Sequence, residues 1–274
     1  MALPTFADAA PAEPTFLDWL RRTTESRWAN TGSCDAATAG LGEPAWQPGT
    51  RWRGGMSQSD LDIVEAMFGV HLPLAYRRFL STLHTPDPPL AALAVRHGRL
   101  VRVEERLFPD WTGPTTPLLG AFEAPMEGIL RGVAIGRWHP AWGDRPDDAR
   151  ERVHLVRALA SAAPRLIPFA GQRYLVALPG HGDGPVIAVH GADVTVIAPD
   201  VAGGLLRELG LGERRHGTPA GGSGAGVTRA TGPASDGSAL VAPGRGASGE
   251  REIPFWSDLM GGIPWLPFGA PVRT

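Results

Sequence analysis

Few residues of this chain have the types and spacing that catalysis requires. His139 precedes Asp144, Asp147 and Asp148, and an imidazole close to carboxylates suits general acid–base chemistry or metal binding. The same acids are well placed to cap a helix that follows them, which is the simpler explanation. We therefore predict no catalytic residue and no metal ligand. A hydrolase that uses His139 and the nearby acids is the alternative.

Other groupings also argue against a cofactor. Glu123 and Glu127 are four residues apart, a common spacing on the solvated face of a helix. The run GGSGAG at 221–226 has the glycines of a phosphate-binding loop, but no strand precedes it and no helix follows. Cys34 is the only cysteine, which excludes an internal disulfide and a thiolate metal cluster. We predict no cofactor.

The 9 tryptophans are the most unusual feature of the composition. A group of three lies in one stretch rich in Pro and Gly: Trp111, Trp138 and Trp142. Acidic residues accompany them: Asp110, Asp144 and Asp147. An aromatic centre with a charged rim is typical of a protein-binding face, because tryptophan buries a large area at low entropic cost. We predict that these residues bind a protein partner, and core packing is the alternative for each tryptophan.

The overall composition excludes several other partners. The chain of 274 residues is 43% hydrophobic and 20% charged, its net charge is −2 and its pI is about 6.4. These values favour a sizeable core and do not favour nucleic acid or a membrane surface. We find no leader sequence and no run of the ~20 apolar residues that span a bilayer, so we expect a cytoplasmic protein. Every basic side chain is arginine, and with 36 Gly and 27 Pro this indicates a GC-rich genome.

The stretch 163–209 organises the predicted fold. Four apolar runs, separated by Gly, Pro or Asp, predict successive short strands at 165–169, 173–178, 185–190 and 193–198. Val201, Leu205, Leu206 and Leu209 then change to a helical period. A short helix therefore follows the strands and packs back on the sheet.

Other elements follow from capping and turn signals. Ser57 and Asp60 begin a helix that ends near Gly69, and Pro73 begins the next. The remaining predictions are one or two weak strands within 90–102 with a turn at Gly98, a short helix at 101–108, a helix near 121–132, a strand at 133–138, and a helix from Asp147 or Asp148 to 163.

These elements suggest a division of the chain into four parts. Residues 1–56 hold an N-terminal helix and an irregular extension, and 57–212 hold the α+β domain. Residues 213–250 are rich in Gly, Ser and Pro and predict a flexible linker. Residues 251–274 return with Ile253, Phe255, Trp256 and Leu259, which are too apolar to remain in water. We expect this tail to dock on the domain.

Several of these motifs carry a resemblance. RLIPFAGQRYL at 165–175, PVIAVH at 185–190, GADVTVIAPDVAGGLLREL at 191–209 and IPFWSDL at 253–259 resemble the bacterial Smi/Knr-like, or SUKH, superfamily. Gln172 stands where the family commonly has His, and Ala198-Pro199 replaces a Tyr-Gly-like pair. The resemblance covers roughly 57–209 and 252–260.

The resemblance implies both a fold and a function. The fold is α+β, with a mixed or antiparallel central sheet and helices packed mainly on one side. The function is that of a non-enzymatic protein-binding module, an immunity protein that neutralises a toxin. A regulatory adaptor in cell-wall or growth control is the alternative within the superfamily. The oligomeric state is left open.

Overall fold

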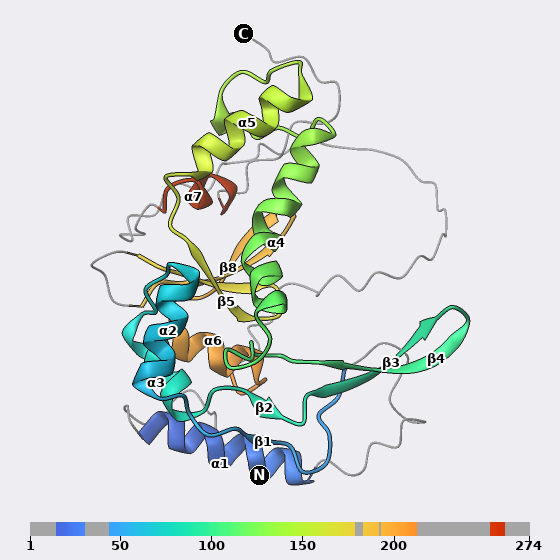
Figure 1. Ribbon diagram of the computed structural model, residues 1–274, viewed down its shortest axis with the longest axis vertical. Helices are drawn as coiled ribbons and strands as arrows, with labels where there is room; N and C mark the ends of the chain where they lie inside the picture. Colours follow the sequence, from blue (N-terminus) through green and yellow to red (C-terminus); the bar gives the residue numbers. More distant parts are fainter. Residues whose placement is uncertain (1–14, 31–43, 179–182, 192, 213–252, 261–274) are drawn as a thin grey trace, which may run out of the picture. The chain divides into compact units, whose positions relative to one another are not determined.

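The computed structural model describes residues 15–30, 44–178, 183–191, 193–212 and 253–260 (Figure 1). The chain divides into one compact unit of Met1–Glu213 with Ile253–Thr274, and a second unit, Arg214–Glu252. All described residues belong to the first unit. The predicted linker, the run at 221–226 and Cys34 lie outside the described residues.

The described residues form an α+β fold, as predicted. The helices are α1 (Thr15–Asn30), α2 (Gln58–Phe68), α3 (Leu74–Thr82), α4 (Thr115–Ala134), the 3-10 helix η2 (Pro140–Trp142), α5 (Ala149–Ala160), α6 (Val201–Glu208) and α7 (Trp256–Met260). The strands are β1 (Arg51–Trp52), β2 (Pro86–Asp87), β3 (Leu90–Arg96), β4 (Arg99–Glu105), β5 (Leu166–Ala170), β6 (Arg173–Val176), β7 (Val186–His190) and β8 (Asp193–Ala198).

The central sheet is antiparallel and has the order β5-β6-β7-β8. Its strands are those predicted from the apolar runs, and tight turns join β5 to β6 and β7 to β8. Gly171 and Gly191 adopt positive φ in these turns, a conformation that glycine tolerates. Asp200 then caps α6 by accepting a hydrogen bond from the Gly203 amide at 2.7 Å. The predicted helix after the strands is therefore confirmed.

Both faces of this sheet are covered, which corrects the expectation that helices pack mainly on one side. The first core gathers buried side chains of α1, α2, α3 and α6 with Ile167 and Phe169 of β5. The second core gathers those of α4, α5 and α7 with Leu166 of β5 and Tyr174 of β6. Neighbouring residues of a strand point to opposite faces, so the two cores lie on opposite sides of the sheet. The sheet strands are apolar on both faces, as covered sheets require.

Local signals placed several helix ends correctly. Ser57 and Asp60 form a reciprocal capping box at the start of α2, and Gly69 ends that helix with left-handed backbone. Pro73 directly precedes α3. Asp148, one of two predicted caps, accepts hydrogen bonds from the amides of Arg150 and Glu151 at the start of α5.

Two predictions from apolar periodicity are wrong. The expected strand at 133–138 is the end of α4 followed by irregular chain, because Val133 continues the apolar face of α4 into the second core. The expected helix at 101–108 is mostly strand β4. A short apolar run has no periodicity of its own that separates helix from strand, so its partners decide its conformation.

Candidate functional site

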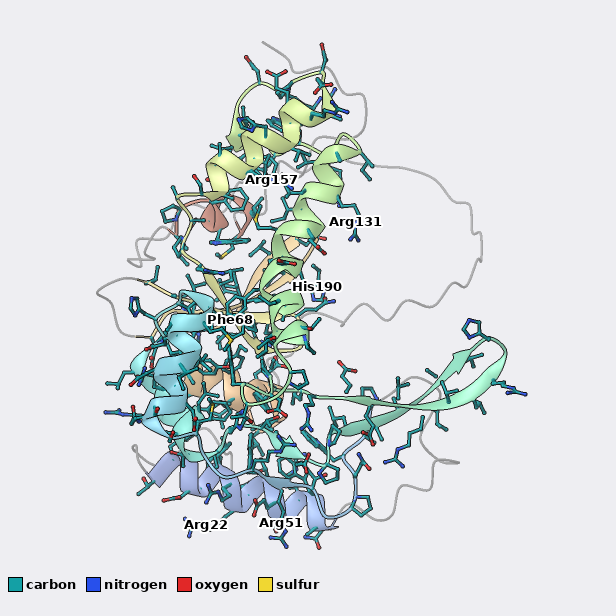
Figure 2. All side chains as sticks on the ribbon, viewed as in Figure 1. Arg22, Arg51, Phe68, Arg131, Arg157 and His190 are labelled. Atoms are coloured by element: carbon teal, nitrogen blue, oxygen red, sulfur yellow. The ribbon has the colours of Figure 1, made fainter. Side chains whose placement is uncertain are left out.

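The three predicted tryptophans are buried in two different cores. Trp111 lies in the first core, where only 4% of it is exposed. Its ring packs edge-on against Phe68 at 5.9 Å, and its Nε1 donates a hydrogen bond to the hydroxyl of Tyr76 at 3.3 Å. Phe68 lies on α2 and is labelled in Figure 2. Its ring also stacks on that of Phe122 of α4 at 5.0 Å. Trp111 therefore joins helices to one another.

Trp138 and Trp142 belong to the second core. Trp138 is fully buried and donates from Nε1 to the carbonyl of Gly143 at 2.8 Å. Trp142 packs edge-on against it at 5.4 Å and stacks in parallel on Phe255 at 5.8 Å. The predicted exposed aromatic centre is thus corrected: the rings do not gather at one surface, and core packing, the alternative, accounts for them. Their role in binding a partner stays a prediction.

The three predicted rim acids are also separated. Asp110 lies in an ion network described below, whereas Asp144 and Asp147 are exposed in the segment between η2 and α5. Asp148 rather than Asp147 caps α5. These acids therefore do not surround one aromatic centre.

His139 lies inside the second core. It is fully buried, its Nδ1 accepts a hydrogen bond from the Ala141 amide at 3.3 Å, and its ring packs 5.7 Å from Trp142. Burial lowers its pKa, and the charge of Asp258 on α7 acts in the opposite direction. Asp144 and Asp147 are exposed to solvent, whereas His139 is buried. The acids of the hydrolase alternative therefore do not converge with His139 in a cleft.

A pair of glutamates four residues apart on α4 also lies on the surface. Glu123 and Glu127 line a pocket of about 450 Å³ beside Leu130 and Arg157, where α4 meets α5 (Figure 2 labels Arg157). Both glutamates are accessible to solvent, as expected of a solvated helix face. Within the described residues, no group of three or more His, Cys, Asp or Glu side chains is arranged to hold a metal ion.

The β3–β4 hairpin presents a different kind of surface. The two strands pair in register from Leu90↔Glu105 to Arg96↔Arg99. His97 and Gly98 form the two-residue turn, both with positive φ, which a type I′ turn requires. Figure 1 shows the hairpin extending away from the helices and the central sheet of its unit. The prediction left open one or two strands with a turn at Gly98, and the structure has two, β3 and β4.

Apolar side chains of the hairpin are left in solvent. Val95 and Leu100 face each other across the strands near the turn, and 62% of each is exposed. In the described part of the chain, the backbone pairing to another element is an isolated bridge between Ala45 and Ala91, on the β3 side. No backbone pairing reaches the outer edge of β4 from any described residue. A two-stranded hairpin is marginal in water by itself, so its base must hold it.

An ion network supplies that base. Asp110 accepts a hydrogen bond from Arg53 at 2.7 Å and lies 3.7 Å from Arg106, the residue that follows β4. Asp87 of β2 pairs with both arginines at 3.2 Å. Four charges of alternating sign therefore connect β1, β2 and the end of β4.

His84 completes this network from the inside. It is 2% exposed, its Nε2 accepts a hydrogen bond from the Trp111 amide at 3.1 Å, and the same atom lies 3.8 Å from Asp110. Burial lowers the pKa of His84, Asp110 opposes this, and Arg53 and Arg106 lower the pKa further. An imidazole that accepts from an amide is neutral at that nitrogen, which agrees with the lowered pKa.

Asp110 is held in its ionised form. Burial alone would raise its pKa, but the hydrogen bond from Thr112 and the charges of Arg53 and Arg106 outweigh burial and lower the pKa. The His84–Asp110 pair is closed to substrate because His84 is buried. The network connects the base of the hairpin to β1, β2 and the chain before α4.

Comparisons with other proteins do not name a function. No protein-family model matches the chain, and neither the curated proteins nor the solved structures contain a match. In the described residues, no helix is long and apolar enough to cross a membrane. The resemblance to the SUKH superfamily stays a prediction.

The importance of the hairpin was not apparent from sequence. Its signal is the stretch LAALAVRHGRLVRVEE, in which two apolar strands flank His97-Gly98. The strands were predicted, but nothing in the stretch shows whether another element covers them. Exposure is a tertiary property, and it distinguishes this hairpin from the covered strands of the central sheet.

Proposed function

We propose that this chain is a non-enzymatic protein-binding module whose contact surface is the β3–β4 hairpin. The observation that carries the proposal is the exposure of Val95 and Leu100 on a hairpin whose β4 edge is unpaired by any described residue. Proteins normally blunt or cover exposed strand edges, because free N–H and C=O groups pair with other strands. A retained free edge with apolar side chains is therefore suited to bind an extended segment of a partner.

Contacts at the base of the hairpin and the geometry of its turn also support this proposal. The Asp110 network fixes its base, and the type I′ turn matches the twist of its strands. A fixed surface loses little conformational entropy on binding, which favours affinity. Opposite charges on β4, Arg102 and Glu104, provide polar selectivity around the apolar side chains.

The SUKH-like motifs support a toxin domain as the partner, so we propose an immunity role. A regulatory role is the alternative within the same class of binding protein. Coexpression separates the two: the captured partner is expressed alone and together with this chain, and growth of the host is followed. An immunity protein restores growth that its partner arrests. Restoration that fails while binding persists favours the regulatory role.

Binding itself is tested with matched surface substitutions. Partners are captured with the full-length chain, identified by mass spectrometry, purified and titrated by calorimetry against variants. Val95→Ser and Leu100→Ser should each weaken binding by roughly tenfold, since a well-packed apolar contact contributes above ~1 kcal/mol.

Val196→Ser is the control, because Val196 is a strand residue of β8 that is 50% exposed. It should bind as the unchanged chain does. Equal loss in all three variants, or no loss in any, would place the binding surface outside the hairpin. Circular dichroism melting of each variant verifies that it is folded.

A further inference from the structure

The outer edge of β4 has a definite hydrogen-bonding pattern. A two-residue turn joins the directly opposed pair Arg96↔Arg99, and opposed residues of an antiparallel ladder alternate between bonded and non-bonded pairs. The backbone groups of Arg99, Val101 and Val103 consequently face β3. Those of Leu100, Arg102 and Glu104 face outward, where an added strand would bond to them.

Two charges of opposite sign lie on either side of Val103 on this edge. Arg102 and Glu104 flank it, and 57% and 56% of their side chains are exposed. They contact each other only at 3.8 Å, and Arg102 also donates to Gln47. A strand that reads cation, apolar residue, anion is complementary to itself when two copies run antiparallel.

We propose that a second copy of this chain occupies the β4 edge. The twofold axis that relates the two copies passes between their Val103 residues, which lie opposite each other. Arg102 of each copy then lies opposite Glu104 of the other. Both residues have outward-facing backbone groups, so each pair is bonded through the main chain as well as through charge. The two hairpins form one continuous four-stranded antiparallel sheet, which is a stable size where a lone hairpin is not.

Other registers are less favourable. Directly opposed side chains share a face of the sheet. A twofold axis perpendicular to the sheet must therefore pass between a residue and the same residue of the other copy. With the axis at Arg102, the Arg102 side chains of the two copies lie opposite each other. With the axis at Glu104, the two Glu104 side chains do so. With the axis at Val101, Leu100 of one copy lies opposite Arg102 of the other, and no ion pair forms. Only the Val103 register pairs opposite charges without opposing like ones.

The faces of the combined sheet support the same register. Ala92, Ala94, Val101 and Val103 share one face of each hairpin, as their opposed pairing shows. Each is only partly covered in the single chain. Joining two β4 edges places the valines of both copies side by side, which extends this apolar face and covers part of it.

The inference rests on the proposed function, in that it takes the same hairpin as the contact surface. It assigns the β4 edge to a second copy, so that a different protein would contact the hairpin on the face that carries Val95 and Leu100. Sedimentation velocity of the full-length chain over a concentration series tests it. The unchanged chain should dimerise reversibly. Arg102→Glu and Glu104→Arg should each weaken dimerisation by at least about tenfold, because two attractive pairs become two repulsive ones.

The decisive measurement mixes the two single variants. Arg102→Glu has acidic side chains at both positions 102 and 104, and Glu104→Arg has basic side chains at both. Each acid of one variant then faces a cation of the other, so the mixture should form a heterodimer more tightly than either variant dimerises alone. The double exchange of Arg102→Glu with Glu104→Arg should dimerise as the unchanged chain does. Arg22→Glu, an equal charge change on the exposed side of α1, should have no effect (Figure 2).

Three results would overturn the dimer: an unchanged chain that remains monomeric at every concentration, single variants that dimerise normally, or a mixture that stays monomeric. The proposed function is judged separately. If the dimer fails but Val95→Ser and Leu100→Ser still weaken capture of a different protein, the hairpin remains the binding surface and its partner is not a second copy. If those two variants also bind normally, the hairpin has no binding role.

Discussion

The Nη1 atom of Arg53 lies 2.7 Å from Oδ2 of Asp110, and this ion pair joins the chain after β1 to the chain before α4. Asp110 is 16% exposed at its side chain and also accepts a hydrogen bond from Thr112 at 3.0 Å. The contact lies at the base of the β3–β4 hairpin and joins residues 57 positions apart in sequence. Removing it therefore tests whether the network supports the hairpin.

Asp110→Asn should lower the free energy of unfolding by about 1–3 kcal/mol, because a partly buried hydrogen bond between charged groups is lost and Arg53 keeps its charge. Urea denaturation measures the change. Asp144→Asn, an exposed acid from the same predicted set, is the control and should change stability by less than ~0.5 kcal/mol. Similar losses in both variants would contradict a structural role specific to Asp110.

The parallel stacking of Trp142 on Phe255 predicts that the C-terminal segment is energetically coupled to the second core. Trp142→Leu and Phe255→Leu should each destabilise the protein, and the double variant should lose about 0.5–1.5 kcal/mol less than the sum. Thermal and urea denaturation give the coupling energy. Trp111→Phe lies in the other core, and its effect should add to that of Phe255→Leu. A coupling energy of zero between Trp142 and Phe255 would show that this contact does not stabilise the protein.

Two glycines of α4 should respond oppositely to alanine. A Cβ at Gly120 would meet nothing within 4 Å, whereas a Cβ at Gly128 would lie 2.9 Å from the Cα of Gly191 in the β7–β8 turn. Gly120→Ala should stabilise the protein by up to about 1 kcal/mol through helix propensity. Gly128→Ala should destabilise it, because backbone must move. If both variants raise the melting temperature, α4 does not approach this turn so closely.

Stability should fall as the pH drops from 7 to 5. Burial keeps the pKa of His84 below its ordinary 6.5 in the folded protein, so the unfolded chain binds the proton more readily. The contribution of His84 is complete above about pH 6.5 and falls below it by up to ~1.4 kcal/mol per pH unit, until the folded pKa is reached. His139, whose pKa is also lowered, acts in the same direction. The stability that Asp110 supplies is present throughout this range and is lost only when the pH falls below about 3.8, because its pKa in the folded protein is lowered.

His84→Asn should reduce this pH dependence. Position 84 has φ +60, a left-handed conformation that Asn tolerates, so the substitution removes the titrating ring without a severe backbone penalty. Urea denaturation at pH 7 and pH 5 gives the slope for each variant. His154→Asn changes an exposed histidine and should keep the slope of the unchanged protein. An unaltered slope in His84→Asn would show that His84 is not responsible.

Features encoded by neighbouring residues were predictable from sequence. The strands β5 to β8, α6, the Ser57–Asp60 capping box and the turn at Gly98 depend on residues close to one another along the chain. Backbone conformation at such turns and caps follows from glycine, proline and short polar side chains. The burial of Ile253, Phe255, Trp256 and Leu259 was also predictable, since so many large apolar groups seek a core.

Only the tertiary structure decided which surface is available for binding. Trp111, Trp138 and Trp142 are near one another in sequence, yet the two sides of the central sheet divide them between separate cores. Asp110 differs from Asp144 because Arg53 reaches it from a remote strand. The apolar strands of β3 and β4 look like those of a covered sheet and are exposed because no described element packs on them. Burial and charge pairing depend on contacts between residues far apart in the chain, and local residue order does not specify those contacts.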